Sequence, residues 1–182
     1  MNDIFSRSPV RLAGSPHPGD ATVHAATLKK IVVDIESQTL IAYDGNTVFR
    51  TCACVTGKSD HPTSQGTWHV MEKRNPCSSL SYKDKEGKPI PMNYAMRFTP
   101  DWQAIHEFNA NWYKDEGDAA KWLQWKLMNI ERWLADNWDA YRKWDDVGSH
   151  GCVRLNEDDA KALYEWVPDP QKTPLKTTVL VK

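Results

Sequence analysis

The sequence predicts a mainly β domain of the α+β class, interrupted by one helical insertion. Three observations indicate this class. Short β-branched or alternating segments recur between residues 29 and 106. A Trp-rich stretch without glycine or proline then covers residues 118–143, and another β-branched run closes the chain at residues 177–181. A chain of 182 residues is long enough for one such domain with a hydrophobic core and an insertion.

The first 27 residues predict an irregular N-terminal arm, because prolines and glycines break every periodic pattern there. The predicted domain covers residues 28–182. It opens with strands at 31–35, 40–43 and 48–55, joined in part by the turn signal at 44–46. Further strands are expected at 68–71, 93–98 and 102–106, with a long polar loop over residues 72–92.

The insertion is expected at about residues 110–146. Its apolar side chains recur every three or four residues, which predicts one helical stripe: Leu123, Leu127, Ile130, Leu134, Trp138 and Tyr141. This helix either closes the core or forms a lid or partner-binding surface. After it, Asn156 can cap a short helix over residues 157–166, where three acidic residues suit the positive end of the helix dipole.

Composition excludes several function classes. The net charge is −1, so there is no overall basic footprint for nucleic acid or an anionic membrane. No apolar run is long enough for a transmembrane helix, and residues 1–20 lack the apolar core of a signal peptide. A substrate outside the cytoplasm would therefore require another export route, or a leader that this sequence lacks.

Four cysteines raise the question of a metal site. Cys52 and Cys54 fall on one face of a predicted strand, and His61, His69 and Cys77 are further potential ligands. A Cys-x-Cys pair without a second paired cluster is a weak zinc signal, so buried small hydrophobic residues are the favoured interpretation. We expect no metal and no cofactor.

The candidate active site is the turn Ser149-His150-Gly151-Cys152-Val153-Arg154-Leu155. A thiol on a tight turn beside imidazole and guanidinium groups is in surroundings that lower the pKa of a cysteine, which favours a nucleophile at Cys152. His150 and His106 are both candidate bases, and His106 is preferred because it ends a predicted strand that can reach Cys152 through the fold. The backbone N–H groups of Gly151 and Cys152 could form an oxyanion hole. Arg154 either binds a substrate carboxylate or forms an ordinary ion pair.

This turn resembles the active-site motif of the L,D-transpeptidase (YkuD) family, in which a His is followed downstream by Ser/Thr-His-Gly-Cys. The resemblance extends over about residues 29–182 except the insertion. It includes residues 31–57, the turn at 62–67, the segments 92–98 and 104–106, and residues 149–167. The resemblance implies a β-sandwich catalytic domain that acts on peptidoglycan stem peptides.

The same resemblance implies roles for individual residues. Cys152 would attack the carbonyl of the third residue of a tetrapeptide stem, expel D-alanine and form a thioester, with His106 as general base. Cross-linking, D-amino acid exchange or carboxypeptidase-type hydrolysis would follow. Ser149 and His150 would shape the pocket and orient the oxyanion. Tyr94 and Arg97 would line the donor site.

Two departures from the family pattern bear on function. Residues 107–148 separate His106 from the motif, a longer spacing than the family shows, and Glu107 follows the histidine where a small residue is familiar. The carboxylate of Glu107 could orient the imidazole or point to solvent. The long insertion gives weight to hydrolysis or exchange.

The missing leader suggests an antibacterial effector, delivered by a secretion machine into the periplasm of a rival cell and paired with an immunity protein. The site of action would be the bacterial cell envelope. Two rival readings remain. A papain-like hydrolase is disfavoured by the order His106 then Cys152, and a non-catalytic module would bind the wall or a partner through the Trp-rich helix.

Overall fold

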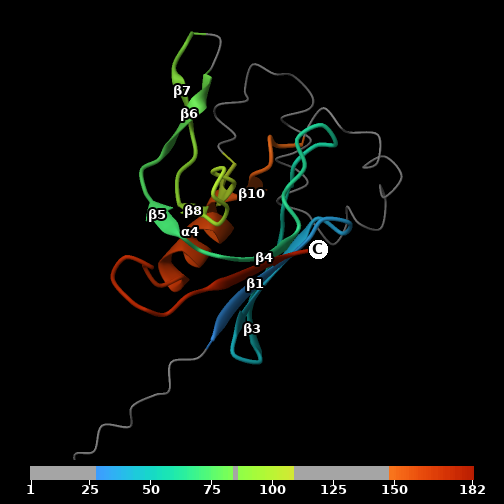
Figure 1. Cartoon of the computed structure of the whole chain (residues 1–182), viewed down its shortest axis with the longest axis vertical. Helices are drawn as coiled ribbons and strands as arrows, with labels where there is room; N and C mark the ends of the chain where they lie inside the picture. Colours follow the sequence, from blue (N-terminus) through green and yellow to red (C-terminus); the bar gives the residue numbers. More distant parts are fainter. Residues whose placement is uncertain (1–27, 84–85, 109–147) are drawn as a thin grey trace, which may run out of the picture.

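The computed structural model describes residues 28–83, 86–108 and 148–182, which form two main sheets, a small hairpin and one helix (Figure 1). The first sheet has the strand order β3-β2-β1-β11-β4. Its strands are β1 (Lys29–Asp34), β2 (Thr39–Asp44), β3 (Thr47–Ala53), β4 (Gly66–His69) and β11 (Thr178–Val181). The last strand of the chain lies parallel to β1, so the two ends of the domain meet in one sheet.

The second sheet carries the candidate site. Its strand order is β10-β9-β8-β5, and its strands are β5 (Glu72–Arg74), β8 (Ala95–Arg97), β9 (Ala104–Glu107) and β10 (Val153–Leu155). Strands β9 and β10 are parallel, so residues from before and after the insertion become neighbours. A separate hairpin, β6 (Ser78–Lys83) with β7 (Pro89–Pro91), projects beyond this sheet (Figure 1).

One core joins the two sheets and the helix α4 (Glu157–Trp166). Apolar side chains from β1, β8, β9 and β10 are fully buried in it, among them Ile31, Met96, Ile105 and Val153. Helix α4 adds Ala160 and Leu163 to this core. The shared core makes the two sheets a sandwich, as the sequence predicts.

Helix α4 has the predicted bounds and the predicted cap. The side chain of Asn156 accepts a hydrogen bond from the backbone N–H of Asp159 at 2.8 Å. This contact satisfies one of the N–H groups that a helix start leaves without an internal partner. The helix begins directly after β10, with Asn156 as the single residue between them.

The polar loop predicted over residues 72–92 is wrong. This segment contains β5 and the hairpin β6–β7. No apolar alternation marks these strands, because all three are short and β5 and β6 are rich in polar residues. Two other predicted strands are shorter than expected. β8 and β9 each begin two residues later than predicted, because Tyr94 and Trp102 have left-handed φ angles of 55° and 71°, and β9 ends one residue later, at Glu107.

The predicted helical insertion at about residues 110–146 and the N-terminal arm lie outside the described residues. Among the residues that the structure describes, no helix is both long and apolar enough to cross a membrane.

Candidate active site

The nucleophile turn, residues 149–155, is fixed at both ends to residues 55–58. At the start, Ser149 N–H donates to Thr56 O at 2.9 Å, and Lys58 N–H donates to Ser149 O at 3.0 Å. At the end, Arg154 and Val55 exchange two backbone hydrogen bonds of 2.8 and 2.9 Å. The turn therefore spans two anchored points, which pre-organises the thiol between them.

Two buried hydroxyl groups hold the turn from within. Ser149 Oγ accepts from the backbone N–H of Gly151 at 3.0 Å and donates to the carbonyl of Cys152. Thr63 Oγ1 donates to the carbonyl of Gly151 at 2.9 Å and accepts from the N–H of Gly57 at 2.8 Å. Ser149 is thus a positioning residue of the turn. Since its hydroxyl occupies the Gly151 N–H, that group is not the free oxyanion donor that the sequence suggested.

Gly151 is required by the geometry of the turn. Its φ is +104°, and a Cβ atom at this position would lie 2.7 Å from Gln103 Nε2. Gln103 is itself held, because its Oε1 accepts from the N–H of Ser64 at 2.8 Å. Thr63 and Gln103 were not expected as site residues. The family-like turn at 62–67 was the one available signal for Thr63, and the sequence has none for Gln103.

The nucleophile candidate Cys152 is half-buried, and its pKa is raised above the ordinary value of a thiol. Desolvation is the largest cause. A hydrogen bond from the backbone of Ala104 and the charge of Arg154 act in the opposite direction but do not prevail. The lowered pKa expected from the neighbouring cationic groups is therefore wrong. The resting side chain is a thiol rather than a thiolate.

Strand register brings His106 to Cys152. Arg154 lies directly opposite His106 in the parallel pair β9–β10, and residues opposite each other in a ladder project to the same face. Cys152 precedes Arg154 by two residues, and its thiol hydrogen-bonds to the backbone of Ala104, two residues before His106. The thiol and the imidazole therefore belong to one face of the second sheet, although the insertion separates them in sequence.

The imidazole of His106 is buried, and its tautomer is determined by a hydrogen bond. Nδ1 lies 2.6 Å from the backbone carbonyl of Glu107, and a carbonyl can only accept, so Nδ1 carries the proton. Burial and then the charge of Arg154 lower the pKa of His106 to about 3. At neutral pH the ring is therefore neutral, with its lone pair on Nε2, which is the state that a general base requires.

The carboxylate of Glu107 is not the group that hydrogen-bonds to the imidazole, nor does it point to solvent. It is buried and accepts from Asn93 Nδ2 at 2.7 Å, while its own N–H donates to Asn93 O at 3.0 Å. Burial raises the pKa of this carboxyl, and the hydrogen bond from Asn93 opposes that shift only in part. The backbone of Glu107, rather than its carboxylate, contacts the histidine.

His150 is exposed and lies among aromatic rings. Its ring centroid is 4.7 Å from that of His61 and 4.4 Å from that of Tyr82 on β6. Desolvation and the nearby charge of Lys58 lower its pKa. The contact with Tyr82 places the β6–β7 hairpin against the nucleophile turn. His150 therefore lies on the side of the turn that faces the hairpin, and its role in shaping the pocket stays a prediction.

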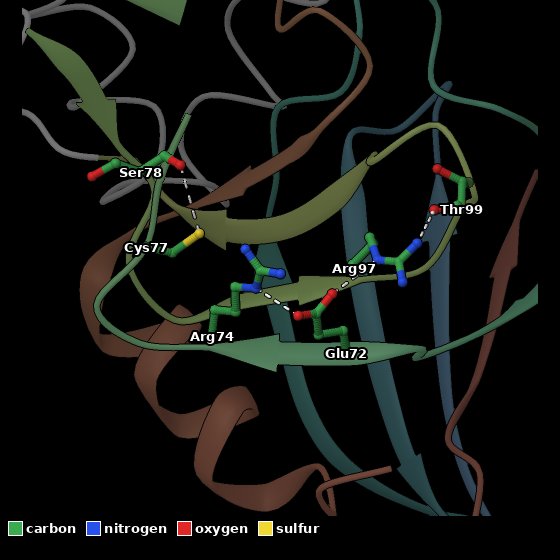
Figure 2. A network of polar contacts seen from close by, with 6 residues as sticks. All are labelled: Glu72, Arg74, Cys77, Ser78, Arg97 and Thr99. Atoms are coloured by element: carbon green, nitrogen blue, oxygen red, sulfur yellow. Dashed lines mark hydrogen bonds and ion pairs between the residues drawn. The ribbon is translucent and has the colours of Figure 1, made fainter. Parts of the chain in front are cut away.

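The three predicted substrate-binding residues have different surroundings. Figure 2 shows Arg97 beside Glu72, with Arg97 Nε 3.3 Å from Glu72 Oε2 and an Nη1 hydrogen bond to Thr99 O at 3.4 Å. The ring centroid of Tyr94 lies 5.9 Å from that of Tyr164 on α4. Arg154 lies on the face of His106, as described above. The substrate contacts of all three stay predictions.

Two of the remaining cysteines lie in the hydrophobic core. Cys52 and Cys54 are free thiols within the hydrophobic core, and burial raises the pKa of Cys52 well above its ordinary range. Both are therefore buried small hydrophobic residues, as predicted. Across residues 28–83, 86–108 and 148–182, no three or more His, Cys, Asp or Glu side chains are grouped so as to hold a metal ion.

Comparison with known proteins agrees with this site. A family model described as the L,D-transpeptidase catalytic domain (YkuD) matches residues 28–181. Among solved structures, an L,D-transpeptidase from Mycobacterium smegmatis superimposes with a TM-score of 0.59 at 20% identity, over 86% of this chain and 59% of that one. A mutant L,D-transpeptidase from Enterococcus faecium gives a TM-score of 0.56 at 25% identity, over 98% of this chain and 57% of that one.

L,D-transpeptidase 1 from Mycobacterium tuberculosis gives a TM-score of 0.54 at 19% identity, over 85% of this chain and 62% of that one. The chain thus spans about three fifths of the length of these solved relatives. No curated protein matched the chain by sequence. Because the family model covers most of the chain, and the motif turn forms a site with a buried histidine, this protein belongs to the L,D-transpeptidase (YkuD) catalytic-domain family.

Proposed function

We propose that this chain is a peptidoglycan-modifying L,D-transpeptidase that works through a Cys152 thioester. One observation carries the proposal: the neutral imidazole of His106, its tautomer fixed through Nδ1, shares a sheet face with the thiol of Cys152. A neutral base and a protonated thiol form a pair that can exchange one proton during attack. The family match supports the peptide bond of a stem peptide as the target.

Acylation proceeds from a thiol rather than a preformed thiolate. As Cys152 Sγ bonds to the carbonyl carbon of the third stem residue, its proton passes to His106 Nε2. The tetrahedral intermediate collapses when the C–N bond to the terminal D-alanine breaks. The imidazolium gives its proton from Nε2 to the leaving amine, and a thioester remains on Cys152.

Deacylation decides the product. An amine attacks the thioester carbonyl, His106 Nε2 takes its proton, and the C–S bond breaks as the sulfur regains a proton. A side-chain amine of a second stem gives a cross-link, and a free D-amino acid gives exchange. Water as the nucleophile gives a shortened stem, which is L,D-carboxypeptidase activity.

Three neighbours support this chemistry in distinct ways. Ser149 holds the turn through its two hydrogen bonds, and Gly151 permits the turn its left-handed geometry. Arg154 adds to the burial that keeps the imidazole neutral, and it draws the pKa of the thiol downward, against the effect of burial there. His150, packed against the rings of His61 and Tyr82, would shape the substrate site beside the thiol.

Mass spectrometry of tetrapeptide-bearing muropeptides, incubated with the protein, tests the proposal. We expect loss of D-alanine with formation of joined stems or of stems with a swapped D-amino acid. Loss of D-alanine alone would identify a carboxypeptidase. Cys152→Ala and His106→Ala should abolish every product, and an unchanged pattern in Cys152→Ala would overturn the nucleophile assignment.

Imipenem provides an independent probe, since a related L,D-transpeptidase has been solved in complex with it. We expect a covalent adduct on Cys152 and none on Cys52, Cys54 or Cys77. The cell envelope is the proposed site of action. Delivery by a secretion machine and pairing with an immunity protein stay predictions, tested by toxicity that appears only when the protein is directed to the periplasm.

A further inference from the structure

Two arginines lie on the same face of the second sheet as the catalytic pair. Arg74 on β5 is opposite Ala95 on β8, and the antiparallel register of β8 with β9, continued by one residue, places Ala95 beside His106. Arg74 and His106 therefore flank one small residue in a single row across the sheet. Arg97 occupies the next row, opposite Ala104 of β9.

The carboxylate of Glu72 holds both guanidinium groups, in each case through the Nε atom of the arginine. Its Oε1 lies 2.5 Å from Arg74 Nε and its Oε2 lies 3.3 Å from Arg97 Nε (Figure 2). Arg97 also uses Nη1, which donates to Thr99 O. In Arg74 the ion pair engages Nε, so the outer edge with the two Nη groups is the part suited to grip a carboxylate in a plane.

Trp102 completes this cluster. Its ring centroid lies 4.6 Å from the Arg74 guanidinium carbon and 4.7 Å from that of Arg97, yet 42% of the residue is exposed. Its φ of 71° is unusual for a bulky residue, and such a conformation costs about 1–2 kcal/mol. Strained residues concentrate at functional sites, so the strained backbone of Trp102 favours a role in contact with a ligand.

The cluster connects directly to the nucleophile turn. Gln103, the next residue after Trp102, packs against Gly151, which precedes Cys152. Arg154 and Asp101 are the opposite charges that act on the thiol of Cys152, and Glu72 pairs with both Arg74 and Arg97. These three arginines and two carboxylates together carry one net positive charge. This face of the sheet beside the thiol is therefore suited to an anionic group rather than a cationic one.

We propose that Arg74, positioned by Glu72, Arg97 and Trp102, binds a carboxylate of the donor stem peptide and so selects stems that carry it over amidated stems. This inference rests on the proposed function. Two carboxylates of a tetrapeptide stem have the required chemistry: the one that ends the side chain of the third residue, and the terminal one of the leaving D-alanine.

Three synthetic stems distinguish these sources: one with both carboxylates, one with the third-residue side chain amidated, and one with a C-terminal amide. The measurement is kcat/KM for release of the terminal residue by wild type, Arg74→Ala, Arg74→Lys and the matched charge-loss control Lys172→Ala. Lys172 is a surface residue paired with Asp169, outside the site. A lost charged hydrogen bond corresponds to a fall of about 10- to 100-fold, mainly through KM.

We expect Arg74→Ala to lower kcat/KM by that factor on the stem with both carboxylates. On the stem whose amidation removes the bound carboxylate, Arg74→Ala and wild type should have the same kcat/KM. Arg74→Lys should restore only part of the activity, because a point charge lacks the fork. Equal losses on all three stems would overturn the subsite. If wild type releases the terminal residue from none of the stems, the proposed function itself fails.

Trp102→Gly guards against a folding artefact. Glycine accepts the left-handed φ without strain, which offsets part of the packing lost with the ring, and the unfolding temperature is measured beside the activity. Loss of the ring removes the surface on which both guanidinium groups pack, while Glu72 still holds their Nε atoms. The variant should show the same reduced discrimination between charged and amidated stems as Arg74→Ala. Full discrimination in a folded Trp102→Gly protein would contradict the role given to the indole.

Discussion

The imidazole of His106 donates from Nδ1 to the backbone carbonyl of Glu107 at 2.6 Å. The other end of the same peptide unit is also held, since Phe108 N–H donates to Leu155 O at 2.6 Å. One peptide unit thus bridges the strands β9 and β10 and selects the tautomer of the base. The backbone carbonyl of Glu107 therefore orients the imidazole. The side chain of the same residue holds it in place, because its buried carboxyl accepts a hydrogen bond from Asn93.

Replacing Glu107 tests whether this support matters for catalysis. Glu107→Gln keeps an acceptor for Asn93 Nδ2 and should retain most activity. Glu107→Ala leaves that donor unsatisfied, at a cost of about 1–3 kcal/mol, and should lower kcat more than it raises KM. Nitrogen-15 chemical shifts of His106 report the tautomer directly. A retained Nδ1–H signal with full kcat in a folded Glu107→Ala protein would show that the carboxyl has no positioning role.

The raised pKa of Glu107 also predicts how stability depends on pH. A carboxyl whose folded pKa is raised stabilises the fold at low pH, and that contribution is lost as pH rises through the raised pKa. Glu107→Gln removes this titration. The unfolding temperature of the variant minus that of wild type should therefore increase between pH 4 and pH 8, as thermal unfolding at several pH values can measure. A difference that is constant with pH would contradict the raised pKa of this buried carboxyl.

Cys152 should react with iodoacetamide as a thiol of raised pKa. The imidazole of His106, with its pKa of about 3, stays neutral through the usual range and cannot hold a thiolate as an ion pair. We expect the alkylation rate to rise about tenfold per pH unit through neutrality and to continue upward beyond the ordinary thiol pKa. A Cys77→Ser background removes the other partly exposed thiol. A plateau already at pH 7 would indicate a preformed ion pair instead.

The sequence predicts those elements of the fold that a local residue pattern determines. Alternation locates the main strands, and the Asn156 cap locates α4 to the residue. Edge strands without apolar alternation, such as β5, leave no comparable signal. The pKa of Cys152 was predicted in the wrong direction because desolvation depends on what the fold packs around a group, which neighbours in sequence do not report. The role of the Glu107 carbonyl was invisible for a similar reason, since every residue has one.

Gly151→Ala should be much more harmful than the same substitution at Gly87. Both glycines have positive φ, +104° and +80°, so both variants incur backbone strain of about 1–2 kcal/mol. Only at Gly151 does the new Cβ meet another group, Gln103 Nε2 at 2.7 Å, whereas at Gly87 no atom lies within 4 Å. The difference in free energy of unfolding between the two variants isolates the steric part. Equal destabilisation, or full transpeptidase activity in Gly151→Ala, would refute the tight contact at the nucleophile turn.

Substitutions of Thr63 can distinguish the contribution of its hydroxyl group to this turn from that of its methyl group. Thr63→Val preserves shape but leaves the carbonyl of Gly151 and the N–H of Gly57 without their shared partner, and burial makes each loss cost about 1–3 kcal/mol. Thr63→Ser keeps both hydrogen bonds and loses one methyl group, about 1 kcal/mol. We expect kcat to fall at least about tenfold in the valine variant and to stay near wild type in the serine variant, measured on folded protein beside its unfolding temperature. If valine is tolerated as well as serine, the carbonyl of Gly151 does not need this anchor, and the turn is held by Ser149 and its backbone contacts with residues 55–58 alone.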